Sequence, residues 1–151
     1  MFKFSRALPA LAAAAIIALA GCGGAAQQGT PEEDIMYITV NGNRLTVDTE
    51  DNASSRALLE RLRSGDVEVE MSDYGDMEKV GCLGFDLPRS DSRISVAPGD
   101  VILYLGNQIT VYYDVSSWNF TRLGHVRGVN SRGDMLQLLG GAGDITAVFS
   151  V

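Results

Sequence analysis

The chain has 151 residues, with 12 Lys and Arg against 19 Asp and Glu, a single His, and a formal net charge of −7 at pH 7. This acidic balance disfavours anionic partners, so we expect no nucleic-acid binding and no membrane attachment through a basic patch. One histidine is too few for zinc sites that need two or more imidazoles, and we expect neither a metal nor a cofactor.

The N-terminal segment has the layout of a secretory signal peptide. Lys3 and Arg6 form a basic start, Ala7–Ala20 is almost wholly apolar, and small residues follow directly. The apolar run is shorter than the roughly 20 residues that a membrane-spanning helix requires. We therefore expect residues 1–21 to be a signal peptide that is removed during export.

A cysteine at the end of this segment predicts a lipid anchor. Residues 19–22, Leu-Ala-Gly-Cys, resemble the bacterial lipobox, in which a peptidase cuts before the cysteine and lipid is attached to its sulfur and its new amino group. Several acyl chains on one residue give durable anchoring. Cys22 is thus predicted to hold the protein in the bacterial cell envelope, on the extracytoplasmic side of a membrane. The alternatives are an ordinary residue of a cleaved signal, or a disulfide with Cys82.

Residues 22–34 are predicted to be the lipidated cysteine and a flexible tether, because Gly23–Pro31 carries no charge and no large apolar side chain. Loss of Lys3 and Arg6 with the signal leaves ten basic against nineteen acidic residues, a net charge of −9. The lipid must therefore hold the protein at the membrane. Residues 35–151 are enough for one domain with a hydrophobic core.

The domain is predicted to open with a hairpin and a helix. Residues 35–40 (IMYITV) and 44–48 (RLTVD) have the composition of strands. Asn41-Gly42 between them favours a tight turn, because both residues tolerate positive φ. After several possible capping residues, the stretch 57–63 (ALLERLR) places its leucines at helical spacing.

The rest of the domain is predicted to be mostly strands. Val67, Val69 and Met71 alternate with glutamates, so they are expected to face inward with the carboxylates outward. Residues 72–81 are predicted to be irregular, and residues 83–87 then alternate before a proline. Further strands are predicted at 93–96, 101–105, 108–113, 118–123 and 145–151, with a second short helix at 134–139. Eight or so short strands and two short helices predict a mainly β fold that closes into a barrel, since closure removes exposed edges.

The order of elements and three phrases resemble the cyclophilin-like fold, and more closely its small bacterial branch of barrel proteins without established activity. The phrases are MSDYGDMEKVG (71–81), PGDVILYLGNQITVYY (98–113) and SSWNFTRLGHV (116–126). With the final helix and strand they cover essentially the whole of residues 35–151. The resemblance implies a closed, eight-stranded cyclophilin-like β-barrel. Classical cyclophilins are peptidyl-prolyl isomerases, whose proline pocket is lined by an arginine beside an aromatic residue on the third strand, a glutamine and phenylalanines.

Most of these isomerase features are missing from the chain. The strand that should bring the arginine, residues 67–71, reads Val-Glu-Val-Glu-Met. A carboxylate cannot donate the hydrogen bond near the prolyl nitrogen that weakens an amide barrier of roughly 18 to 20 kcal/mol. Only a guanidinium from elsewhere, such as Arg44 or Arg122, would restore it. The stretch 106–111 resembles the isomerase strand that carries the pocket glutamine. It keeps that glutamine as Gln108 but lacks the two aromatic residues that follow it in the isomerases. Trp118 corresponds loosely to a tryptophan of the isomerase pocket. We therefore expect no catalytic residue.

Other chemistry is expected to be absent. Six carboxylates within residues 66–78 suggest calcium, but their spacing matches no EF-hand loop, and alternate residues of a strand ordinarily form its solvated face. His125 and the serines Ser116 and Ser117 fit no hydrolase motif, so His125 is expected at a strand end or on the surface. Lys79, the only lysine left after processing, is expected to be a solvated partner of nearby carboxylates.

Aromatic and amide side chains form the best candidate binding surface. Consecutive strand residues face opposite ways, so if Tyr113 points inward, Tyr112 lies on the outer face with Gln108 and Thr110. Tyr74 lies in a glycine-flanked segment and is either exposed for recognition or folded back as a lid. The residues predicted to bind a ligand are Tyr74, Gln108, Tyr112 and Trp118.

These patterns together predict a membrane-anchored, extracytoplasmic cyclophilin-like domain that binds a peptide or small molecule without catalysing a reaction. The alternative is a peptidyl-prolyl cis-trans isomerase that assists the folding of envelope proteins. A third possibility, an accessory domain for a redox or metabolic partner, rests on fold-level analogy alone.

Overall fold

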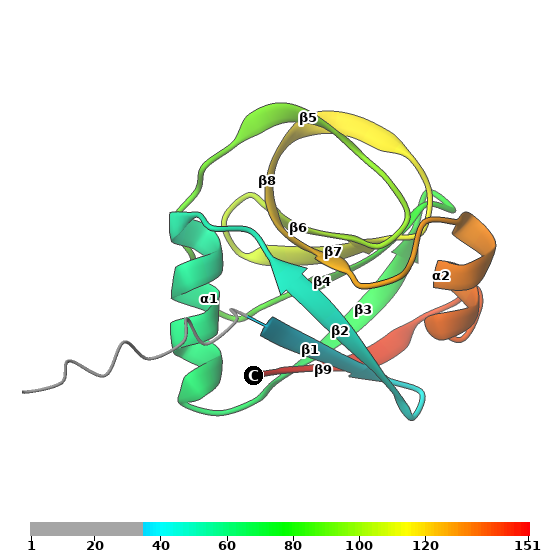
Figure 1. Ribbon diagram of the computed structural model, residues 1–151, viewed down its shortest axis with the longest axis horizontal. Helices are drawn as coiled ribbons and strands as arrows, with labels where there is room; N and C mark the ends of the chain where they lie inside the picture. The colour runs from blue at the N-terminus through cyan, green and yellow to red at the C-terminus, as the bar shows by residue number, and fades with distance from the viewer. Residues whose placement is uncertain (1–34) are drawn as a thin grey trace, which may run out of the picture. The chain divides into compact units, whose positions relative to one another are not determined.

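The computed structural model of the chain describes residues 35–151 (Figure 1). The signal peptide predicted at 1–21, the lipidation site Cys22 and the tether predicted at 22–34 lie outside the described residues. Within residues 35–151, neither helix has the length and apolar character that crossing a membrane requires.

The described residues form antiparallel strands and two helices. Their bounds are β1 Ile35–Val40, β2 Asn43–Thr49, α1 Ala53–Arg63, β3 Val67–Tyr74, β4 Glu78–Cys82, β5 Ser92–Val96, β6 Asp100–Tyr104, β7 Gln108–Tyr112, β8 Ser116–Val126, α2 Arg132–Leu138 and β9 Ile145–Ser150. The predicted hairpin, both helices and most of the strands are confirmed.

Eight of the strands close into a barrel. Their order is β2-β1-β9-β3-β4-β7-β6-β8, and the pairing of β8 with β2 joins the two ends of the sheet. The ninth strand, β5, pairs only with the first half of β8 and lies outside this ring. The prediction of a closed eight-stranded barrel with two short helices is therefore confirmed.

Local sequence signals explain the first elements. Asn41 and Gly42 have φ values of 48° and 77°, as a tight two-residue hairpin turn requires. The Asn52 side chain caps α1 by accepting a hydrogen bond of 2.9 Å from the backbone N–H of Ser55. The buried face of α1 includes the three leucines of the predicted pattern, and the helix packs against β8 and β9.

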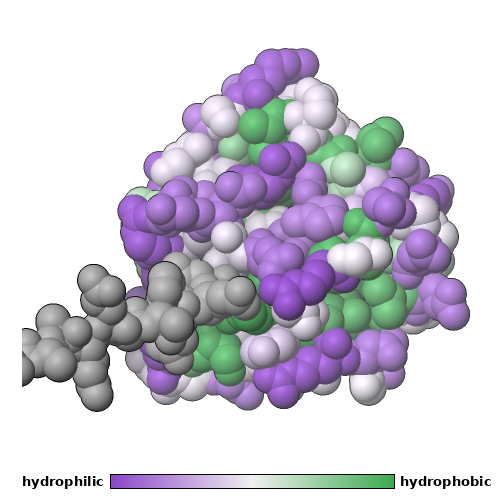
Figure 2. Space-filling model, in the orientation of Figure 1, coloured by the Kyte–Doolittle hydropathy of each residue, from purple (hydrophilic) through white to green (hydrophobic). Residues whose placement is uncertain are grey.

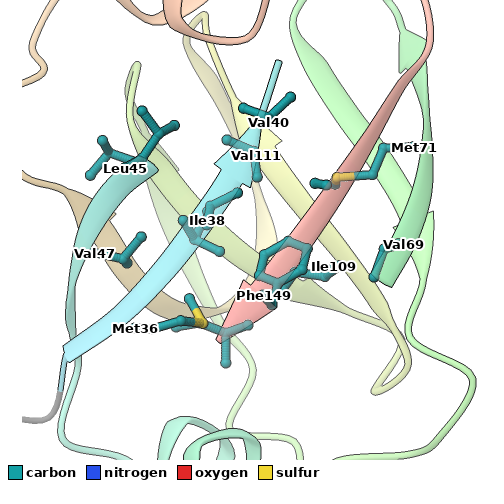
Figure 3. Packing of buried hydrophobic residues seen from close by; sticks show 14 of the residues in the cluster. Met36, Ile38, Val40, Leu45, Val47, Val69, Met71, Ile109, Val111 and Phe149 are labelled. Atoms are coloured by element: carbon teal, nitrogen blue, oxygen red, sulfur yellow. The ribbon is translucent and has the colours of Figure 1, made fainter. Parts of the chain in front are cut away.

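The barrel interior is filled by alternate residues of its strands (Figure 3). In β3, Val67, Val69 and Met71 are buried while Glu68 and Glu70 are exposed, as predicted. The same alternation brings Met36, Ile38, Val40, Leu45, Val47, Ile109, Val111 and Phe149 into the core. On the outside, Figure 2 shows a face on which hydrophilic residues are interspersed with smaller hydrophobic areas.

Residues 72–81, predicted to be irregular, instead form the end of β3 and most of β4. Gly75 and Asp76 have φ values of 61° and 55° and turn the chain, so that Tyr74 pairs with Glu78. Conversely, residues 83–87 alternate without forming a strand. Backbone hydrogen bonds from Leu83 to the Asn107 carbonyl and from Leu87 to the Gly106 carbonyl hold them against the β6–β7 turn.

Lys79 is fully buried, which corrects the expectation of a solvated ammonium. Its Nζ lies 2.7 Å from Asp73 Oδ2 and donates to the carbonyls of Gly141 at 2.9 Å and Gly143 at 2.6 Å. The Tyr113 ring lies 5.5 Å from the same nitrogen. The loop after α2 thus supplies backbone acceptors that compensate for the loss of water around the charge.

Candidate functional site

A cavity of about 500 Å³ lies on the outside of the barrel wall, under a second layer of strand. Residues 121–126 of β8 pair within the barrel, whereas residues 116–120 pair with β5 and form that outer layer. The lining side chains come from five strands, β3, β4, β6, β7 and the outer half of β8, and from the turn between β3 and β4. They are Tyr74, Met77, Glu78, Val80, Tyr104, Gln108, Thr110, Tyr112, Ser116, Ser117, Trp118 and Phe120.

A small apolar cluster lies between the barrel wall and the outer layer formed by β5 and the first half of β8. Its buried members, Val96, Ile102, Tyr112 and Phe120, form a cluster distinct from the barrel core. Phe120 contacts two tyrosine rings, at centroid distances of 6.0 Å to Tyr104 and 5.8 Å to Tyr112. Edge-to-face and tilted aromatic contacts of this kind favour defined ring orientations. Packing therefore defines the positions of the Tyr104, Tyr112 and Phe120 rings in the cavity wall.

Strand β7 supplies the floor of the cavity. Gln108, Thr110 and Tyr112 point outward to it, whereas Val111 and Tyr113 point into the barrel core. This is the alternation that the sequence predicted. Tyr112 is 3% exposed and lies at the floor, while Tyr74 at 64% and Trp118 at 55% form the open rim.

The structure brings the four predicted binding residues together, since Tyr74, Gln108, Tyr112 and Trp118 all line this one cavity. Of the two alternatives for Tyr74, the structure has features of both, because the side chain is largely exposed and also lines the cavity. That these residues bind a ligand stays a prediction.

Two buried polar side chains face the same cavity without complete hydrogen bonding. Glu78 is 8% exposed and Thr110 is 1% exposed. Within residues 35–151, neither Glu78 Oε2 nor Thr110 Oγ1 has a hydrogen-bond partner. Burial raises the pKa of Glu78, and a hydrogen bond from the Tyr112 hydroxyl acts in the opposite direction. Burial and the adjacent Glu78 carboxylate also raise the pKa of Tyr112, so this phenol stays protonated.

A family model described as the cyclophilin-like family matches residues 38–150. The chain belongs to the cyclophilin-like family. The matched residues run from within β1 to the end of β9 and so include all of the cavity lining. No curated protein and no solved structure matches the chain.

This cyclophilin-like domain has no basic side chain in the lining of its cavity, as described over residues 35–151. The two arginines that the sequence offers as replacements for the isomerase guanidinium are engaged elsewhere. Arg44 stacks on Tyr37, with its guanidinium carbon 3.8 Å from the ring centroid. Arg122 Nη2 donates to the Ser95 carbonyl at 2.8 Å and to Asp100 Oδ2 at 3.1 Å.

The other groups that the sequence raises as chemical candidates lie in different parts of the described domain. His125, near the end of β8, has Asp100 Oδ1 and the Val129 carbonyl as partners, each at 2.8 Å. Ser116 and Ser117 line the cavity instead, so no triad forms with His125. Cys82 is an exposed free thiol. Across residues 35–151, no group of three or more His, Cys, Asp or Glu side chains is placed to hold a metal ion.

The sequence pattern places Glu78 in a solvated acidic cluster, whereas the structure places it in the lining of the cavity. Further lining residues that the prediction lacks are Met77, Val80, Ser116 and Ser117. The local signal that could have identified Glu78 is the Gly75-Asp76 pair, whose residues both adopt positive φ. A hairpin at that point makes Glu78 the first residue of a strand, opposite Tyr74. The pairing of β4 with β7, which is distant in the sequence, places Glu78 opposite Tyr112. This pairing places Glu78 beside Tyr112 at the floor of the cavity.

Proposed function

We propose that this cyclophilin-like domain is a non-catalytic binding module that takes a peptide or small molecule in the cavity between Tyr74 and Trp118. The observation that carries the proposal is the combination of aromatic walls with a few polar groups at the floor in a cavity of about 500 Å³. Binding sites typically have this composition and volumes of about 300 to 1,000 Å³.

The absence of a basic group among the described lining residues argues against prolyl isomerisation. Weakening the resonance of a prolyl amide needs a hydrogen-bond donor at the nitrogen, and a positively charged donor is the effective one. Glu78 instead offers a carboxylate. The Gln108 amide at the cavity is the one feature that favours the alternative of an isomerase acting on envelope proteins.

The single tryptophan of the chain, Trp118, gives a direct binding assay, because it lies at the rim of the cavity. A screen of peptides and small molecules should find ligands that shift its fluorescence emission in a saturable way. Tyr74→Ala and Gln108→Ala should each weaken the binding of such a ligand roughly 5- to 30-fold, as removal of a binding residue commonly does. Tyr37→Ala is the matched control, since Tyr37 lies on β1 and not in the cavity lining.

A proline-peptide isomerisation assay separates the two functions. We expect the mature chain to leave the isomerisation rate unchanged. A catalytic efficiency near that of ordinary cyclophilins, lost in Gln108→Ala, would replace the binding module with the isomerase.

The proposal includes a location outside the cytoplasm, with the domain tethered to a membrane of the bacterial cell envelope through lipid on Cys22. Its support is the sequence pattern of basic start, apolar run and lipobox. Cell fractionation should recover the protein with membranes and metabolic labelling should show a fatty acyl chain on it. Cys22→Ser should lose both, and Cys82→Ser, which removes the other cysteine, should lose neither.

A further inference from the structure

We infer that the ligand of this cavity carries a protonated amine, whose N–H groups bond Glu78 and Thr110 at the floor while aromatic rings surround the adjacent carbon atoms. The inference rests on the proposed binding function and names the chemical class of its ligand.

The first step is the hydrogen-bonding deficit at the floor. Buried polar atoms in native proteins nearly always have partners, yet Glu78 Oε2 and Thr110 Oγ1 have none within residues 35–151. The two residues are diagonal neighbours on the outer face, because Glu78 pairs with Tyr112 and Thr110 lies two positions before Tyr112 on β7. Diagonal neighbours lie within reach of one shared group. A group with several N–H donors would satisfy both oxygen atoms.

The second step is charge. The cation nearest to Glu78 in the sequence is Lys79, but its side chain lies on the other face of β4 and is fully occupied by Asp73 and two carbonyls. No Lys or Arg of residues 35–151 lines the cavity. A buried carboxylate without a cation is costly, and a cationic ligand would remove that cost. The net charge of the chain, −7, also favours the approach of cations over that of anions.

The third step is the wall above the floor. Five of the lining residues are aromatic, namely Tyr74, Tyr104, Tyr112, Trp118 and Phe120. The face of an aromatic ring attracts a cation, and tryptophan and tyrosine do so more strongly than phenylalanine. An ammonium group at the floor would thus have a carboxylate, a hydroxyl and aromatic rings among its neighbours, and its carbon atoms would lie near those rings.

A protonated amine can belong to a small molecule or to a lysine side chain in a peptide. Phenethylamine and an acetylated, amidated Ala-Lys-Ala peptide represent the two sources. Phenethyl alcohol has the same skeleton without the charge, and trimethyl-phenethylammonium has the charge without an N–H donor. Each is titrated into the mature chain at neutral pH, with Trp118 fluorescence and calorimetry as the readouts.

We expect saturable binding of phenethylamine, of the lysine peptide, or of both, and the tighter of the two identifies the source. The alcohol and the trimethyl compound should bind at least about tenfold more weakly, since one lacks the charge and the other the hydrogen bonds. Glu78→Gln should weaken amine binding by at least about tenfold, and Thr110→Val by a smaller factor. Glu68→Gln is the matched control, because Glu68 is an exposed carboxylate on β3 that does not line the cavity.

Thermal unfolding of each variant, monitored by circular dichroism, establishes that the barrel is intact before binding is compared. The absence of amine binding, or amine binding that Glu78→Gln and Thr110→Val leave unchanged, would overturn the inference. A neutral ligand that binds the cavity equally well in the Glu78→Gln variant would overturn the inference and leave the binding module standing. A cavity that takes no ligand of any charge in the wider screen would overturn both.

Discussion

Glu78 and Lys79 are consecutive residues of β4 whose buried side chains lie on opposite faces of the barrel wall. The alternation of a strand prevents these two opposite charges from pairing with each other. Lys79 has a carboxylate and two carbonyls as partners on its side. Glu78 faces the cavity with Oε2 unpartnered among the described residues. The partners of Lys79 thus lie within the described domain, whereas one oxygen of Glu78 has none there and its side chain lines the cavity.

The free energy of unfolding should rise when Glu78 is replaced by Gln. Burial raises the pKa of Glu78 in the folded state. A raised folded-state pKa means that the folded protein disfavours the ionised carboxylate relative to the unfolded chain. The contribution of the group to stability is therefore fully present below its unfolded pKa and is lost as the pH rises through its folded pKa. Urea unfolding should therefore show Glu78→Gln to be more stable than the wild type at neutral pH.

The same variant should show little difference from the wild type at acidic pH, where the carboxyl is neutral in both states. Glu68→Gln serves as the control for a carboxylate on the surface, and its stability should follow that of the wild type at both pH values. A Glu78→Gln variant that is less stable than the wild type at neutral pH would contradict this account of Glu78.

Replacement of Lys79 by Met should destabilise the domain by about 3 to 5 kcal/mol, because it leaves Asp73 without its cation and removes the donor of two backbone carbonyls. The expected result is a lower urea midpoint with an unchanged dependence on urea concentration. Arg56→Met is the matched control. Arg56 pairs with Asp51 at the surface, so its replacement should cost under about 1 kcal/mol. Equal losses in the two variants would contradict a structural role for the buried lysine.

The stability of the domain should fall in acid through Asp73. Burial tends to raise the pKa of Asp73, but hydrogen bonds from Lys79, from the Tyr113 hydroxyl at 2.6 Å and from the Gly143 N–H outweigh it and hold the pKa below its usual range. A carboxylate with a lowered folded pKa contributes stability that is present above its unfolded pKa and is lost as the pH falls through the folded value.

A series of urea titrations at decreasing pH should therefore show a shallower loss of stability for Asp73→Asn than for the wild type, from a lower starting value. Asp134→Asn is the comparison, because Asp134 lies in the first turn of α2 and is exposed. Parallel pH profiles for the wild type and Asp73→Asn would rule out Asp73 as a source of the acid sensitivity.

The sequence predicts those parts of the fold whose causes are local. The Asn41-Gly42 turn and the alternation of Val67, Val69 and Met71 depend on neighbouring residues alone, and the structure has both. The outward position of Gln108 and Tyr112 follows from the same two-residue period. Strand alternation assigns the inner and outer residues of β3, and in β7 it does so once Tyr113 is known to point inward.

The burial of Glu78 and Lys79 has causes that are distant in the sequence. Lys79 is enclosed by the carbonyls of Gly141 and Gly143, 62 and 64 positions away. Glu78 is covered because β8 pairs with β5 instead of continuing in the barrel, and this pairing joins residues 92–96 to residues 116–120. A cluster of charged residues in a sequence predicts that each of them is exposed to solvent. The burial of Glu78 and Lys79 follows only from these long-range pairings.

Gly81 should not accept a side chain without strain, because the neighbouring strand β3 lies directly against it. A Cβ atom added there would lie 2.4 Å from the Glu70 carbonyl oxygen and 2.5 Å from Val69 Cγ1. The first of these is backbone of the adjacent strand β3 and cannot move without disturbing the β3–β4 pairing. Gly81→Ala should therefore lower the free energy of unfolding by about 1 to 3 kcal/mol, as overpacking of a core commonly does.

Gly133→Ala is the matched control for this substitution. A Cβ atom at Gly133 meets nothing within 4 Å, and the residue lies in α2, where alanine is favoured over glycine. The control should raise the free energy of unfolding by a few tenths to about 1 kcal/mol. Urea unfolding of the two variants should thus move in opposite directions. A Gly81→Ala variant with the same free energy of unfolding as the wild type would contradict the close contact between Gly81 and β3.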